Sequence, residues 1–240
     1  MYEPRFYRHW SVDKDLVSFS VTVKETDLYI RAKRDLQPEA RQLVIKERTA
    51  LENYIRRHPG FVVAMEPYPV EDKAPDIVKE MAEAAEKVGV GPMAAVAGAI
   101  AERVGKELLK LSPEVIVENG GDIFLKSLKK RLVGIYAGKS AFADQLALEV
   151  QASETPLGIC TSSGTVGHSL SFGKADAVIV LAPRTALADA AATAIGNIIK
   201  EVDDIPQGLD FAKEIEGLKG VAIIKDDKMA LWGKIKIARR

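Results

Sequence analysis

The sequence is short of several residue types that would define a class of protein. Only one cysteine, Cys160, occurs among 240 residues, which excludes an intramolecular disulfide and a zinc site built from several cysteines. Lysine plus arginine and aspartate plus glutamate both number 34, so the formal net charge is zero. Without an excess of positive charge, the composition does not favour a nucleic acid or an anionic membrane as a partner. Small molecules are therefore the expected ligands.

Long apolar runs are also missing. The most apolar segment, 92–101, has ten residues and is interrupted by Gly98, whereas a membrane-spanning helix needs about 20. The first ten residues are charged and aromatic, with no apolar stretch followed by a cleavage site of small residues. We therefore expect a cytoplasmic protein with no export signal and no membrane span.

What remains is the composition of an ordinary globular protein, with 47% hydrophobic and 28% charged residues. No internal repeat or low-complexity linker divides the chain, and only the loop at 66–74, with two prolines and several charges, resembles a boundary. We expect a single domain over residues 1–240. The lone thiol of Cys160 has no partner nearby in the sequence, which favours a buried structural cysteine over a nucleophile.

The apolar patterns predict a mixture of strands and helices. Alternation predicts a hairpin over 16–30, and further strands are expected at 61–65, 115–117, 123–125, 132–136, 146–150, 157–160, 177–181, 221–224 and 230–237. Helices are expected over 38–57, 76–88 and 186–199, and from Pro92 onward, where small apolar residues on nearly every side predict a buried helix. Because strands and helices do not alternate regularly, this is an α+β or layered α/β fold with mixed or antiparallel sheets.

The helix at 186–199 carries the first candidate site. Asp189 and Thr193 are four residues apart, which places a carboxylate and a hydroxyl on one side, about 6 Å apart at their Cβ atoms. Mg²⁺ takes oxygen ligands, few of them from the protein, so this pair is a candidate metal site. The alternative is that Asp189 is a charge favoured in the first turn by the helix dipole and that Thr193 has no special role.

A hydroxyl-rich loop is the second candidate. Glycines let backbone N–H groups approach phosphate oxygens, and hydroxyls donate to the same oxygens. The candidate ligand-binding residues here are Thr161, Ser162, Ser163, Gly164 and Thr165, and His168 is the candidate general base. A polar loop between strands and a structural histidine are the simpler interpretations.

A glycine turn is the third candidate. Asn119, Gly120, Gly121 and Asp122 form first of all a hairpin turn of the Asn-Gly kind, and they also offer backbone amides beside carboxylates to a ligand. Gly89-Val-Gly-Pro92, which leads into a helix, is a possible anion site, but it lacks the lysine of a P-loop and the spacing of a dinucleotide fingerprint.

Together these segments resemble the FAD:protein FMN transferase (ApbE) superfamily, in which an Asn-x-Gly-Gly turn, a Thr-Ser-Gly loop and an Ala-Asp-Ala-x-x-Thr-Ala helix follow in that order. Over nearly its whole length the chain is also similar to an uncharacterised ApbE-like protein family. The resemblance to the transferases is carried by Asn119-Gly-Gly-Asp122, Thr161-Ser-Ser-Gly164 and Ala188-Asp-Ala-Ala-Ala-Thr-Ala194. The similarity to the uncharacterised family is carried by Glu25-Thr-Asp27, Val90-Gly-Pro-Met-Ala-Ala-Val-Ala-Gly98, Val117-Glu-Asn-Gly-Gly-Asp122 and Cys160-Thr-Ser-Ser-Gly-Thr-Val-Gly-His-Ser-Leu-Ser-Phe-Gly173.

The resemblance implies Mg²⁺ held by Asp189 and Thr193, FAD with its pyrophosphate between the loops, and an ApbE-like fold. His168 falls roughly where the transferases carry a histidine. Three features differ: Val96-Ala-Gly98 lacks the transferases' lysine, the loop between Gly164 and His168 is shorter, and no export signal is seen. A Mg²⁺-dependent flavin transferase-like enzyme, a non-catalytic flavin or nucleotide binder, and a scaffold or assembly protein therefore remain as alternatives, and a homo-oligomer is also left open.

Overall fold

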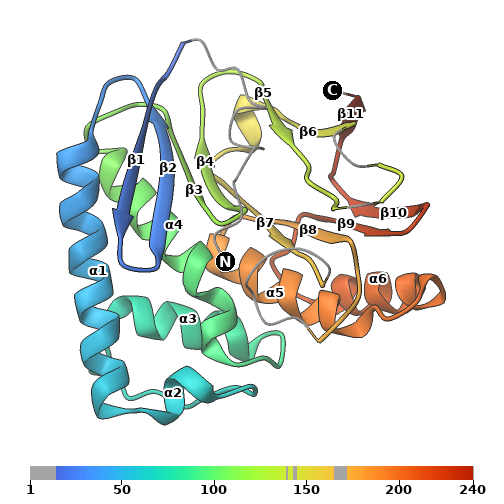
Figure 1. Ribbon diagram of the computed structural model, residues 1–240, viewed down its shortest axis with the longest axis horizontal. Helices are drawn as coiled ribbons and strands as arrows, with labels where there is room; N and C mark the ends of the chain where they lie inside the picture. Colours follow the sequence, from blue (N-terminus) through green and yellow to red (C-terminus); the bar gives the residue numbers. More distant parts are fainter. Residues whose placement is uncertain (1–14, 139, 143–144, 165–171, 240) are drawn as a thin grey trace.

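The main sheet has eight antiparallel strands. The computed structural model describes residues 15–138, 140–142, 145–164 and 172–239 (Figure 1). The strand order is β1-β2-β3-β4-β7-β8-β9-β10, and every neighbouring pair is antiparallel. The strands are β1 (Val17–Val23), β2 (Thr26–Ala32), β3 (Val115–Asn119), β4 (Asp122–Lys126), β7 (Leu157–Ser162), β8 (Ala177–Ala182), β9 (Gly220–Lys225) and β10 (Lys228–Gly233).

A second, three-stranded sheet covers one face of the first. It has the order β11-β6-β5, with β5 at Arg131–Gly134, β6 at Leu146–Val150 and β11 at Ile237–Arg239. A single cluster of buried apolar side chains joins the two sheets, because it includes Val133 and Leu148 of the small sheet as well as Ile116, Leu125 and Ile179 of the large one.

The helices lie on the opposite face of the main sheet (Figure 1). They are α1 (Gln37–Arg57), α2 (Gly60–Val63), α3 (Asp76–Glu86), α4 (Val96–Leu108), α5 (Thr185–Ile198) and α6 (Ile205–Glu214), with the 3₁₀ turns η2 (Pro92–Ala95), η3 (Ala152–Glu154) and η4 (Val202–Asp204). Of these, α4 packs on β3 and β4, and α5 packs on β7 and β8. The expected α+β fold, with layers of helices and antiparallel sheets, is thus confirmed.

Two helices rich in small residues, α4 and α5, form the centre of the helical layer, and burial was predicted for the first of them. Ala99 and Ala101 of α4 and Ala188, Ala190 and Ala191 of α5 have no exposed surface. The helices cross closely, since a Cβ added to Gly98 would lie 2.5 Å from the carbonyl oxygen of Thr185. No helix among the described residues combines the length and the apolar character needed to cross a bilayer.

The prediction of a strand at 61–65 is wrong. Residues 61–63 belong to the short helix α2, and the buried ring of Phe61 packs edge-on against Tyr54 and Tyr68. Pro59 precedes the helix with a helical φ of −63°, so the proline before Gly60 begins a new turn instead of ending the segment. The apolar residues Val62 and Val63 therefore stay largely exposed instead of entering a sheet.

The C-terminal region also differs from the expectation. Helix α6 was not predicted, because Pro206 and Gly208 interrupt its apolar pattern; the proline falls in the first turn, where it is tolerated. The run 230–237, expected as one strand, is divided between β10 and β11 in different sheets. The chain bends between them at Gly233, where φ is +79°.

Candidate functional site

The turn between β3 and β4 forms one side of the candidate site. Asn119 pairs with Asp122 across the hairpin, and the two residues between them, Gly120 and Gly121, have φ values of +68° and +107°. Two positive φ angles at the centre of a two-residue hairpin are the geometry that favours glycine. The predicted turn is thus confirmed, and it is stabilised by a hydrogen bond that the amide of Gly121 donates to Oε1 of Glu118 at 2.9 Å.

This turn lies against the start of α4. Nδ2 of Asn119 donates to the carbonyl oxygen of Ala97 at 3.1 Å. The amide of the next residue, Gly98, donates to Oδ2 of Asp189 at 2.8 Å. Amides in the first turn of a helix lack acceptors within that helix, so Asp189 supplies one from α5. The turn, the start of α4 and Asp189 of α5 are therefore in one place.

Two carboxylates, Asp122 and Asp189, meet there, and we call them the carboxylate pair. Asp122 is only 7% exposed, and its Oδ1 is buried with no hydrogen-bond partner among the described residues. The pKa of Asp122 is raised well above its usual range, first by burial, then by the charge of Asp189 and to a lesser extent by that of Glu118. Hydrogen bonds from the Cys160 thiol and the Thr161 amide act in the opposite direction. Two adjacent carboxylates in a poorly solvated place favour uptake of a proton or a cation.

The pKa of Asp189 is raised as well, to about 7, because of burial. The amides of Gly98 and Ala97 act in the opposite direction by donating to the carboxylate. The side chain is half-buried, so it can be reached from outside while Asp122 lies deeper.

Cys160 lies beside the pair and is fully buried, as expected. Its Sγ is 3.4 Å from the carbonyl oxygen of Thr185. Burial, together with the charges of Asp122 and Asp189, raises the pKa of the thiol well above its usual range. A thiol held in its neutral form is a poor nucleophile, so Cys160 is part of the packing beneath the site.

Helix α5 carries a row of three half-buried polar residues, Asp189, Thr193 and Asn197, at four-residue spacing. Because the helix is continuous over this stretch, the predicted placement of the carboxylate and the Thr193 hydroxyl on one side of it is confirmed. Oδ1 of Asn197 accepts from the amide of Phe172 at 2.9 Å, so the row runs from the carboxylate pair to the segment that returns into β8.

The hydroxyl-rich loop begins at the end of β7. Thr161 and Ser162 are the last residues of that strand, and the carbonyl oxygen of Thr161 would lie 4.0 Å from a Cβ at Gly121. The loop and the glycine turn are therefore adjacent. The amide of Gly164 donates to the carbonyl oxygen of Ala175 at 2.9 Å, while Ser163 lies between, half-buried.

Two predicted residues of this loop, Thr165 and His168, lie outside the described residues.

Glu102 is a residue that the sequence patterns did not single out. It is fully buried on α4, and its Oε2 accepts from the amides of Thr185 at 2.6 Å and Ala186 at 3.4 Å. Its charge is balanced by Lys106, whose Nζ lies 2.6 Å from Oε1. Glu102 therefore caps α5 from another helix and fixes the element that carries Asp189. The sequence signal that could have indicated a cap from elsewhere is Arg184, the residue before α5, because its side chain does not cap the helix.

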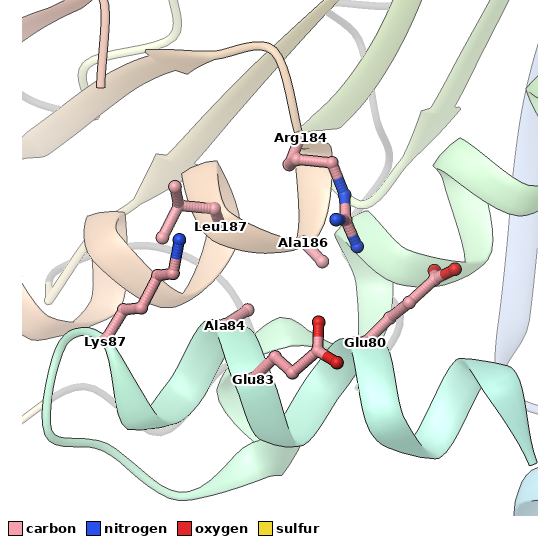
Figure 2. Close-up of a pocket in the computed structure, with 7 residues that line it drawn as sticks. All are labelled: Glu80, Glu83, Ala84, Lys87, Arg184, Ala186 and Leu187. Atoms are coloured by element: carbon pink, nitrogen blue, oxygen red, sulfur yellow. The ribbon is translucent and has the colours of Figure 1, made fainter. Parts of the chain in front are cut away.

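A separate pocket lies between α3 and the start of α5 (Figure 2). Figure 2 shows the guanidinium of Arg184 directed toward the side of the pocket where Glu80 and Glu83 lie, while Lys87 extends toward Leu187. Its volume of about 40 Å³ accommodates only a few water molecules. The pocket is too small for a flavin, and none of the predicted site residues lines it.

Comparison with known proteins gives the family of the chain. The family model described as AbpE bacteria matches residues 8–231. The UPF0280 protein of Methanocaldococcus jannaschii is 42% identical over 221 residues, which covers 90% of each chain. The UPF0280 protein of Methanocella arvoryzae is 42% identical over 219 residues, with 90% of this chain and 89% of the relative covered.

Solved structures of similar fold agree with this. The apo flavinyl transferase ApbE of Pseudomonas stutzeri has a TM-score of 0.57 at 13% identity, over 91% of this chain and 95% of the other. The flavin transferase ApbE of Vibrio cholerae has a TM-score of 0.54 at 14% identity, over 90% and 96%. At such identities the likeness is one of fold. By sequence and by fold, the chain belongs to the UPF0280 family of ApbE-like proteins described by the AbpE bacteria model.

Proposed function

We propose that this site binds Mg²⁺ together with the pyrophosphate of FAD or a related nucleotide. The observation that carries the proposal is the carboxylate pair. Asp122 and Asp189 are brought together in a place where burial disfavours their charges, and one oxygen of Asp122 has no hydrogen-bond partner among the described residues. A divalent cation supplies the missing partner and neutralises both carboxylates.

The donor set suits Mg²⁺ among the common metals. Asp122, Asp189 and Thr193 offer only oxygen atoms, which hard cations prefer. Within the described ranges, no group of three or more His, Cys, Asp and Glu side chains is arranged to hold a metal. A site with one or two carboxylates, completed by water and ligand phosphate, is the usual arrangement for Mg²⁺ and not for Zn²⁺.

The surrounding residues suit a pyrophosphate. The hydroxyls of the loop are donors for phosphate oxygens, and the glycines of both segments leave space for them. The amides of Gly121 and Gly164 already donate within the chain, so these two glycines provide space and not donors. We propose that the pyrophosphate site is lined by Asn119, Gly120, Gly121 and Asp122 of the turn and by Thr161, Ser162, Ser163, Gly164 and Thr165 of the loop. Of these residues, Asn119 acts indirectly, because its side-chain amide donates to the carbonyl oxygen of Ala97 and so positions the start of α4.

The reaction we propose is that of a Mg²⁺-dependent flavin transferase-like enzyme, supported by the fold shared with the flavin transferases. An acceptor hydroxyl would attack the FMN phosphorus of FAD, an oxygen–phosphorus bond of the diphosphate would break, and AMP would leave. His168 would take the proton of the acceptor hydroxyl as general base. Mg²⁺, when bound, supplies positive charge to the diphosphate as the bond breaks.

A non-catalytic flavin or nucleotide binder is the second candidate. It is favoured by the absence of a lysine at Val96-Ala-Gly98, where the Gly98 amide is already bound to Asp189. A binder of this kind needs the pair and the turn but no base. A scaffold that has kept only the fold predicts no ligand and no dependence on Mg²⁺.

The test is titration of FAD, FMN and ADP into the purified protein with and without Mg²⁺, together with an assay for AMP released from FAD. We expect saturable binding that requires Mg²⁺ and is lost or strongly weakened in Asp189→Asn and Asp122→Asn. Asp210→Asn is the matched control, since Asp210 is an exposed carboxylate on α6 paired with Lys213. Release of AMP by the wild type and its loss in Asp189→Asn separate the enzyme from the binder. Binding that is indifferent to Mg²⁺ and to both variants would refute the proposal.

A further inference from the structure

Phe172 combines an exposed aromatic ring with a backbone fixed at both polar groups. Its side chain is 59% exposed. Its amide donates to Oδ1 of Asn197 at 2.9 Å, and its carbonyl oxygen accepts from Nζ of Lys200. Both partners come from the end of α5 or just beyond it. An exposed apolar ring thus stands on a segment whose backbone is hydrogen-bonded to α5 and the residues that follow it.

The segment that carries Phe172 lies beside the proposed ligand site. A Cβ on Gly164 would overlap the carbonyl oxygen of Gly173, and one on Gly173 would overlap the carbonyl oxygen of Gly196. Three stretches of backbone therefore touch: the end of the hydroxyl-rich loop, the residue after Phe172, and the last turn of α5. Glycine is required at these positions because nothing larger fits.

The distance from the carboxylate pair suits a nucleotide. Asn197, which holds the Phe172 amide, follows Asp189 by two helical turns on the side of α5 that also carries Thr193. Eight residues at about 1.5 Å rise each give about 12 Å along the axis. In a nucleotide, a sugar or ribityl chain separates the ring from the phosphates, so a ring-binding residue belongs some way along α5 from the metal and the diphosphate.

We propose that Phe172 is the platform on which the planar ring of the bound flavin or nucleotide stacks, and this inference rests on the proposed function. Stacking on an aromatic side chain stabilises a bound base without requiring hydrogen-bond readout. A side chain with two χ angles on a fixed backbone also loses little conformational freedom on binding. The ring is either isoalloxazine or adenine, and both offer a flat π face.

The test compares four proteins, namely the wild type, Phe172→Ala, Phe172→Leu and Phe172→Tyr, each titrated with FAD, FMN, ADP and inorganic pyrophosphate in the presence of Mg²⁺. We expect Phe172→Ala to weaken FAD binding about tenfold or more. Phe172→Leu, which keeps apolar bulk without a π face, should be weakened similarly, and Phe172→Tyr should stay within about twofold of the wild type. Pyrophosphate binding should not change in any variant.

The ligands also identify the ring. If Phe172→Ala weakens the binding of FAD and FMN only, the ring on Phe172 is the isoalloxazine. If it weakens the binding of FAD and ADP only, the ring is the adenine. The stacking role would be overturned, and the Mg²⁺ site left standing, by either of two results. One is that Phe172→Ala weakens pyrophosphate binding as much as FAD binding, and the other is that it binds FAD as tightly as the wild type. Failure of the wild type to bind any of these ligands would instead overturn the proposed function and this inference with it.

Discussion

Removing one charge of the carboxylate pair should stabilise the metal-free protein at high pH. In Asp189→Asn the side chain keeps its shape, and its oxygen can still accept from the Gly98 amide that donates to Asp189. The variant no longer carries a charge that burial disfavours. We therefore expect a substitution at a proposed binding residue to raise the free energy of unfolding.

The magnitude follows from Asp189, whose pKa is raised from 3.8 to about 7. A rise of about three pKa units at about 1.36 kcal/mol each gives about 4 kcal/mol for ionising this carboxyl in the folded state. Because Asp189 is half-buried and water screens it, we take about half of this, about 2 kcal/mol. For a chain of this size that corresponds to a rise in Tm of about 4–8 °C.

The sign with pH follows from linkage. A carboxyl whose pKa is raised by folding binds more protons in the folded state between the two pKa values, so the free energy of unfolding falls as pH rises from about 4 to about 7. Above pH 7 the destabilisation is complete. Asp189→Asn should therefore be more stable than the wild type at pH 8 and lose most of that added stability at pH 5.

The assay is thermal and urea unfolding followed by circular dichroism at pH 8 and pH 5 without divalent metal, with Asp210→Asn as control. Added Mg²⁺ should stabilise the wild type at pH 8 and have little effect on Asp189→Asn. Equal destabilisation of Asp189→Asn at both pH values would show that folding does not disfavour the ionised Asp189 carboxylate, and would contradict this prediction.

Three further predictions concern two glycines of the site and a buried ion pair elsewhere in the fold. Gly98→Ala should destabilise the protein by about 2 kcal/mol or more and weaken Mg²⁺ binding, because the new methyl group would lie 2.5 Å from the Thr185 carbonyl oxygen; unchanged Mg²⁺ affinity by calorimetry would argue against this coupling. Gly121→Ala should lower the free energy of unfolding in urea by about 1–2 kcal/mol because φ at this position is +107°. An unchanged free energy of unfolding would mean that the turn adopts another conformation. Arg131→Ala should cost about 3–5 kcal/mol in urea unfolding, since it leaves the buried Glu114 carboxylate, 2.9 Å from the guanidinium, short of a partner. A small loss of stability would show that Lys33, whose Nζ lies 2.6 Å from the other oxygen of Glu114, is a sufficient partner.

The parts of the fold that the sequence predicts well are those determined by local chemistry. The glycine turn at 119–122 is required by two positive φ angles, and the Asp189–Thr193 spacing needs only a continuous helix. Segment 61–65 was mispredicted because a short apolar run fits a strand or a buried helix equally well. In the structure Pro59 begins a helical turn and Phe61 packs against Tyr54 and Tyr68, and neither feature can be read from the apolar run itself.

The carboxylate pair could not be predicted from local patterns. Asp122 ends a turn and Asp189 lies in a helix far along the chain, and they meet because α5 packs beside α4 and on β7. The close approach at Gly98 and the cap from Glu102 both depend on this packing. The resemblance to ApbE-like proteins placed the three segments at one site, but the pairing of the carboxylates required the structure.

A crystal structure of the protein soaked with Mn²⁺ and ADP would locate the cation directly, because the anomalous signal of Mn²⁺ marks its position. We predict a peak about 2.0–2.3 Å from oxygens of both Asp122 and Asp189, with the diphosphate between the 119–122 turn and the 161–164 loop. A cation bound elsewhere, with Oδ1 of Asp122 still lacking a partner, would contradict the proposed Mg²⁺ site.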